Sequence, residues 1–71
     1  MSGQSFAGWL RDQHQSPRWY SQLAQAARRD PAFPKQGDIT AVHARLITMG
    51  ADGDAFEQLD DAAREWPGRA N

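Results

Sequence analysis

Residues 29–38 read RDPAFPKQGD, and this stretch decides how the chain folds. The flanking residues follow helical spacing, whereas these ten contain two prolines and a glycine. A residue before proline is pushed out of helical geometry, so Asp30 ends the preceding helix and Phe33 is held extended. The prolines also reduce the conformational entropy that is lost on folding. The stretch therefore predicts a rigid connector between two helices, with Phe33 turned into the core.

Four helical segments are predicted, two on each side of the connector. Each begins at a residue suited to cap a helix. Proline or glycine ends the last three, at Asp30-Pro31, Gly50 and Pro67-Gly68. No segment alternates at period two for long enough to be a strand. The predicted fold class is therefore all-α, a compact bundle of four or so short helices. The predicted caps are Ser5, Ser16 before Pro17, Asp38, and Asp54 with Glu57 in capping-box spacing.

Apolar residues recur in each segment at the spacing of one helix face. All three tryptophans fall on these faces, which predicts packing for them rather than stacking on nucleic-acid bases. Tyr20, one residue away from the Trp19 stripe, is expected to be partly exposed. Ala26 or Ala27 continues the second face, and Met49 ends the third. The predicted core residues are Phe6, Trp9, Leu10, Trp19, Leu23, Phe33, Val42, Leu46, Phe56, Leu59 and Trp66.

The bulk composition describes one small domain. The 71 residues suffice for a single helical unit (1–71), with its core at about residues 5–66 and short flexible tails. The chain has no cysteine, so it has neither a disulfide framework nor a thiolate metal site. No apolar run is long enough for a signal peptide or a membrane span. We therefore expect a cytoplasmic protein without membrane contact.

The chain resembles the YozE/SAM-like (sterile-alpha-motif-like) family of small uncharacterised bacterial proteins, over about residues 5–66. The most specific element is Asp30 followed by Phe33-Pro34-Lys35. The resemblance implies a helical bundle without catalytic residues. Nucleic-acid binding has been suggested for the family, and SAM-like bundles serve both protein and nucleic-acid contacts. The other matching positions are Ser5-Phe6, Trp9-Leu10, Leu23-Ala24, Asp38, Val42, Leu46, Leu59, Ala62 and Trp66.

The sequence offers no pattern typical of catalysis or metal binding. His14 and His43 lie on different predicted segments and lack the i+4 partner of a zinc site. Asp52-Gly53-Asp54 resembles the start of a calcium loop, but Ala63 occupies the position of the bidentate glutamate. Glycine patterns for phosphate loops, dinucleotides or a nucleophile elbow are lacking. We expect a non-catalytic protein without a cofactor or metal.

Charge is distributed unevenly, although the net charge is −1. Residues 1–49 hold six basic and three acidic side chains, whereas residues 50–66 hold six acidic side chains and Arg64. Such asymmetry can orient a partner. The favoured interpretation is a protein-interaction module with an unidentified partner, and the complementary ends also suit self-association. The acidic residues predicted to bind the partner are Glu57, Asp60, Asp61 and Glu65.

Two alternatives use the same charges differently. The first is a nucleic-acid-binding protein with a basic patch on the first three helices, although a dedicated DNA-binding domain is usually distinctly basic. The second and less favoured is an acidic DNA mimic that inhibits a nucleic-acid enzyme. The residues predicted to contact phosphates in the first alternative are Arg18, Arg28, Arg29, Lys35 and Arg45.

Overall fold

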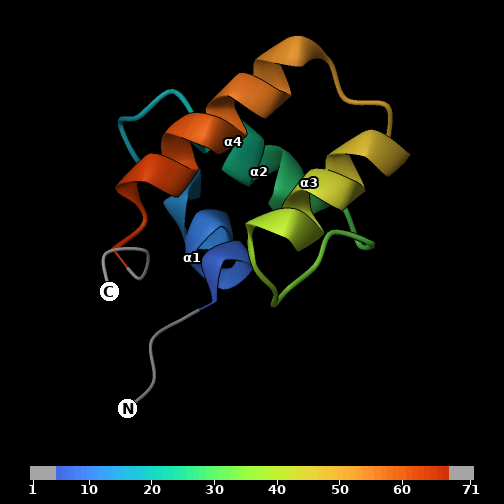
Figure 1. The fold of residues 1–71 in the computed structure, drawn as a ribbon. Helices are drawn as coiled ribbons and strands as arrows, with labels where there is room; N and C mark the ends of the chain where they lie inside the picture. The colour runs from blue at the N-terminus through green and yellow to red at the C-terminus, as the bar shows by residue number, and fades with distance from the viewer. Residues whose placement is uncertain (1–4, 68–71) are drawn as a thin grey trace.

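The computed structural model describes residues 5–67, which form four α-helices and one 3-10 turn, with no strand in that range (Figure 1). The predicted all-α fold class is confirmed. The predicted tails, residues 1–4 and 68–71, lie outside the described residues. The elements are α1 (Phe6–Asp12), η1 (Gln13–Gln15), α2 (Ser21–Arg29), α3 (Ile39–Thr48) and α4 (Gly53–Glu65).

The helices surround one apolar core. α1 packs against α2 and α3, and α4 packs across α2 and α3 (Figure 1). Trp9, Phe56 and Trp66, which were predicted in the core, are half-buried and pack against its edge. The aromatic rings of Phe6 and Trp66 pack edge to face, with ring centres 5.5 Å apart. The buried apolar residues are Phe6, Ala7, Leu10, Tyr20, Leu23, Ala24, Ala27, Phe33, Val42, Leu46, Leu59 and Ala62.

The connector ends α2 and buries Phe33, as predicted. α2 ends at Arg29, and Asp30, which precedes Pro31, has an extended backbone with φ −97° and ψ 108°. The Phe33 N–H donates to the Asp30 carbonyl at 3.1 Å, and the Asp30 carboxylate accepts from the Ala32 N–H at 3.0 Å. Proline at the second position and aspartate at the first are typical of such a tight turn. The turn directs Phe33 inward, where it is 3% exposed.

Gly37 joins the end of the connector to the start of α1. Its carbonyl accepts from the Ala7 N–H at 3.0 Å. Its backbone φ of 131° is a value that residues with a side chain rarely adopt. A Cβ at this position would also lie 2.9 Å from the Ala41 Cβ. Glycine is therefore required here for both its conformation and its size.

Three helix ends follow the local signals in the sequence. Ser5 and Asp38 cap α1 and α3, and each accepts from a backbone N–H three residues ahead, at 3.2 and 3.1 Å respectively. Gly50 ends α3 with φ 71°, and its N–H donates to the Ile47 carbonyl at 3.1 Å. These ends are predictable because each depends on residues that are close in sequence.

The start of α2 differs from the prediction. Ser16-Pro17 does not begin a helix. Residues 17–20 form a bend followed by a turn, and α2 begins at Ser21. Tyr20 is consequently buried at 3% exposure, whereas Trp19 is 42% exposed. The predictions that Trp19 lies in the core and that Tyr20 is partly exposed are therefore wrong. A stripe of Tyr20, Leu23 and Ala27 has helical spacing as good as the stripe that begins at Trp19.

The start of α4 also differs. Asp52, not Asp54, is the N-cap residue, and its carboxylate accepts from the Ala55 N–H at 3.2 Å. Asp54 lies in the exposed first turn, where an acidic side chain suits the helix dipole. Both aspartates are suitable caps, and the earlier one gains a further half-turn of helix. On the inner face of α4, Ala62 is fully buried, whereas Ala63 is partly buried and packs against the core.

Candidate functional site

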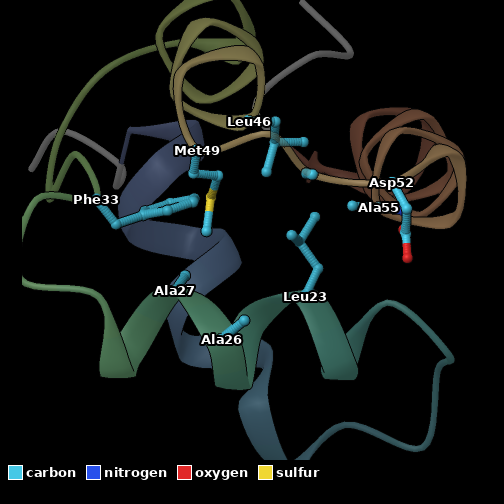
Figure 2. Close-up of a pocket in the computed structure, with 9 residues that line it drawn as sticks. Leu23, Ala26, Ala27, Phe33, Leu46, Met49, Asp52 and Ala55 are labelled. Carbon is cyan, nitrogen blue, oxygen red and sulfur yellow. The ribbon is translucent and has the colours of Figure 1, made fainter.

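An apolar pocket opens between α2, the connector, the end of α3 and the start of α4 (Figure 2). Its volume is about 210 Å³. Phe33 forms one side, Met49 reaches over the pocket from the end of α3, and Ala26 and Ala27 lie opposite on α2 (Figure 2). The lining residues are Leu23, Ala26, Ala27, Phe33, Leu46, Met49, Ala51, Asp52 and Ala55.

The pocket exists because small side chains face one another across it. Two alanines, Ala26 and Ala27, line it from α2, and two more, Ala51 and Ala55, line it from the other side. Axes of packed helices lie about 8–10 Å apart, and methyl groups alone do not fill that separation. Sequence reasoning did not identify this site, because facing alanines become visible only once the helices are placed.

The mouth of the pocket combines exposed apolar groups with negative charge. Ala26 is exposed, and the flexible Met49 side chain is 44% exposed. Asp52 is the charged residue among those that line the pocket, and its carboxylate lies at the α4 side (Figure 2). Asp54 follows in the exposed first turn of α4. The pocket therefore offers an apolar interior beside an acidic helix start.

A second cluster fastens residues 18–20 to the end of α4. The Tyr20 hydroxyl donates to Glu65 Oε1 at 2.8 Å, and Arg18 Nε lies 3.2 Å from the same oxygen. Trp19 Nε1 donates to Asp61 Oδ2 at 2.5 Å. Burial, together with the hydrogen bond to the Glu65 carboxylate, raises the pKa of Tyr20 to about 12.

This cluster reduces the predicted acidic face. Glu57 and Asp60 are exposed, as expected for solvated residues. Asp61 and Glu65 also lie on the outer side of α4, but their carboxylates are already bonded to residues within the chain. They are therefore structural ties, and a partner would have to displace those bonds to use them. The other two acidic side chains of this predicted face, Glu57 and Asp60, lie nearer the start of α4.

Two of the predicted phosphate-binding residues are likewise engaged. Arg45 Nε and Nη2 donate to the two Asp30 carboxylate oxygens at 2.9 and 3.0 Å. This bidentate bond holds the pKa of Asp30 below its ordinary value and raises the pKa of Arg45. Arg18 is paired with Glu65. Arg45 and Arg18 therefore stabilise the connector and the segment before α2, respectively.

The other predicted basic residues are exposed. Arg28 and Arg29 line a shallow hollow of about 390 Å³ beside η1, together with His14, Gln15 and Gln25. Lys35 is exposed on the connector and is not among the residues that line this hollow. The structure thus brings Arg28 and Arg29 to one surface but does not gather all five predicted residues there.

Residues 5–67 contain neither a cluster of metal ligands nor a helix suited to span a membrane. No three His, Asp or Glu side chains in that range are grouped closely enough to hold a metal ion. His14 Nδ1 lies 3.3 Å from the Arg11 carbonyl, and His43 packs edge to face against Phe56 with ring centres 5.2 Å apart. None of the described helices is long and apolar enough to cross a membrane.

Among the described surfaces, the apolar pocket differs from the ion-pair clusters because the fold does not use it to hold two segments together. The charged pairs of Asp30 with Arg45 and of Glu65 with Arg18 hold the chain together, whereas the pocket leaves apolar side chains in contact with water.

No family model, curated protein or solved structure matches this chain.

Proposed function

We propose that this protein is a small non-catalytic binding module whose apolar pocket receives one large apolar side chain of a protein partner. The observation that carries the proposal is the pocket between α2, the connector, α3 and α4. Its volume of about 210 Å³ is smaller than the 300–1,000 Å³ of typical small-molecule sites. It therefore suits a single anchoring side chain better than a cofactor or a metabolite.

The pocket can adapt to such an anchor. Met49 is unbranched and polarisable, and methionine fills irregular gaps better than branched side chains do. Burial of one leucine-sized or phenylalanine-sized side chain stabilises a complex by about 1.5–3 kcal/mol. That gain alone does not offset the entropy lost on association. The partner segment must therefore make further contacts around the pocket.

Charge at the mouth indicates what those contacts are. Asp52 and Asp54 begin α4, and the one basic residue of α4 is Arg64, in its last turn. A lysine or arginine beside the apolar anchor would meet these carboxylates, and such complementarity increases specificity and association rate. The proposed occupant is thus a peptide segment with one large apolar residue flanked by a basic residue.

A peptide-display selection tests this function. A library of short random peptides is selected on the protein, and the enriched peptides are synthesised for affinity measurement by fluorescence anisotropy. The variant Ala26→Glu places a charge at the exposed mouth of the pocket, and Ala44→Glu makes the same change on the exposed side of α3. Both keep a good helix former in place, so both variants should fold.

We expect the enriched peptides to share a large apolar residue beside a lysine or arginine. Their affinity should fall about tenfold or more for Ala26→Glu, which corresponds to at least about 1.4 kcal/mol. It should stay unchanged for Ala44→Glu. Peptides that bind Ala26→Glu as well as the unchanged protein would contradict the proposal.

We also propose that the chain is a bacterial, cytoplasmic member of the YozE/SAM-like family. What supports this is the structural use of the element that carries the resemblance. Asp30 binds Arg45 and forms the tight turn, and Phe33 is buried. Residues with such linked tasks are the ones that a family sharing this connector would need to keep.

A further inference from the structure

The hollow between η1 and α2 presents two arginines that form no ion pair with an acidic side chain of residues 5–67. Arg28 and Arg29 are both exposed in the last turn of α2. The ion pairs within residues 5–67 use three other arginines, Arg18, Arg45 and Arg64. The hollow has a volume of about 390 Å³ and is lined by polar or charged residues throughout, namely His14, Gln15, Gln25, Arg28 and Arg29.

The opposite wall of the hollow is held in place by hydrogen bonds. Gln25 Nε2 donates to the His14 carbonyl at 3.1 Å, which fixes η1 against α2. His14 Nδ1 lies 3.3 Å from the Arg11 carbonyl. Because a carbonyl only accepts, Nδ1 is the nitrogen that carries the proton, and this bond leaves Nε2 available.

The charge balance of this hollow favours an anion. The carbonyl end of a helix carries roughly half a negative charge, which is smaller than the two positive charges on Arg28 and Arg29. Asp30 is the next residue along the chain, but its carboxylate is bound on both oxygens by Arg45. The two arginines therefore keep a net positive charge that this aspartate does not neutralise.

We infer that this hollow binds phosphate groups, with Arg28 and Arg29 as the principal ligands. The planar guanidinium group donates to phosphate oxygens in a bidentate manner. The phosphate can belong to a nucleic-acid strand or to a free phosphorylated compound, and the chemistry of the site is the same for both. The inference goes beyond the proposed function, because the hollow and the apolar pocket share no lining residue.

A nitrogen-15 NMR titration tests the inference and separates the two sources. One arm adds inorganic pyrophosphate, and the other adds a short single-stranded oligothymidylate. Either probe should shift the side-chain signals of Arg28, Arg29 and Gln25. Affinity for the oligonucleotide should fall with salt with a logarithmic slope of about −1.4, the value for two phosphate contacts on a single strand.

Paired variants supply the control. Arg28→Gln with Arg29→Gln should lower the affinity at least about tenfold, whereas Lys35→Gln with Arg64→Gln removes the same charge elsewhere and should leave it nearly unchanged. Binding of the strand alone would identify nucleic acid as the source, and equal binding of pyrophosphate would identify a free phosphate compound. An absence of shifts with both probes, or equal losses in the two double variants, would overturn the inference.

Discussion

Phe33 belongs to the connector, is buried in the core and also lines the apolar pocket. It is 3% exposed, yet its ring forms one side of the apolar pocket (Figure 2). Phe33→Ala should therefore lower the free energy of unfolding by about 3 kcal/mol, because it removes a large buried group and leaves a cavity. Urea denaturation measures the change. A midpoint equal to that of the unchanged protein would show that the ring adds nothing to the core.

A second variant keeps this test useful if the alanine variant does not fold. Phe33→Leu retains most of the apolar volume and should cost less than Phe33→Ala. It should also leave the connector in place, because Pro31, Pro34 and the Asp30 turn are unchanged. The order of stabilities, unchanged protein above Phe33→Leu above Phe33→Ala, is the expected result.

Tyr20 provides a spectroscopic test, because it is the only tyrosine in the chain. Its pKa is raised to about 12 by burial and by the bond to Glu65. The neutral phenol is therefore favoured in the folded state, and this contribution to stability is complete below about pH 10 and is lost as the pH rises through about 12. The tyrosinate absorbance should titrate near 12 in the native protein and near 10 in urea.

The same residue shows where sequence reasoning reached its limit. Trp19 and Tyr20 are adjacent, and either can begin the stripe that continues through Leu23 and Ala27. The choice depends on a distant contact, because the Tyr20 hydroxyl needs the Glu65 carboxylate of α4. A native titration midpoint near the ordinary tyrosine value would contradict the buried position of Tyr20. The buried position would also be contradicted if the Tyr20→Phe variant lost stability at alkaline pH as steeply as the unchanged protein does.

At the scale of the elements, helix ends fixed by local chemistry were predictable and others were not. Ser5, Asp38 and Gly50 act within a few residues, and all three have their predicted roles. The start of α2 depends instead on α4, since Gln58 Oε1 accepts the Leu23 N–H at 2.9 Å. This bond satisfies a backbone donor in the first turn of α2, where Tyr20 supplies no side-chain cap.

Helix α4 holds acidic residues with different tasks, which gives a matched comparison. Glu65→Lys removes the acceptor of the Tyr20 hydroxyl and places a cation beside Arg18, so it should cost about 1–2 kcal/mol. Asp60→Lys makes the same charge change at an exposed position and should stay within about 0.5 kcal/mol. Thermal unfolding of both variants measures the difference. Equal melting temperatures would show that the cluster at the end of α4 adds nothing to stability.

At the scale of the whole molecule, the sequence predicted the all-α class and most of the core but did not predict the pocket. Leu23, Phe33 and Leu46 were predicted as core residues, and they are buried while also forming the pocket walls. The open volume depends on how α2 and α4 are placed, which spacing along the chain does not specify. The pairing of acidic and basic residues is non-local for the same reason, as Asp30 with Arg45 shows.

The most direct test of the central proposal is a methyl NMR titration with the peptide enriched in the display selection. Met49 and Leu23 line the pocket, whereas Ile47 is 61% exposed and does not line it. We expect the methyl signals of Met49 and Leu23 to shift and to show nuclear Overhauser contacts to the apolar anchor of the peptide. The Ile47 methyl signals should stay in place. A peptide that binds while the Met49 and Leu23 signals remain unchanged would contradict the proposed function.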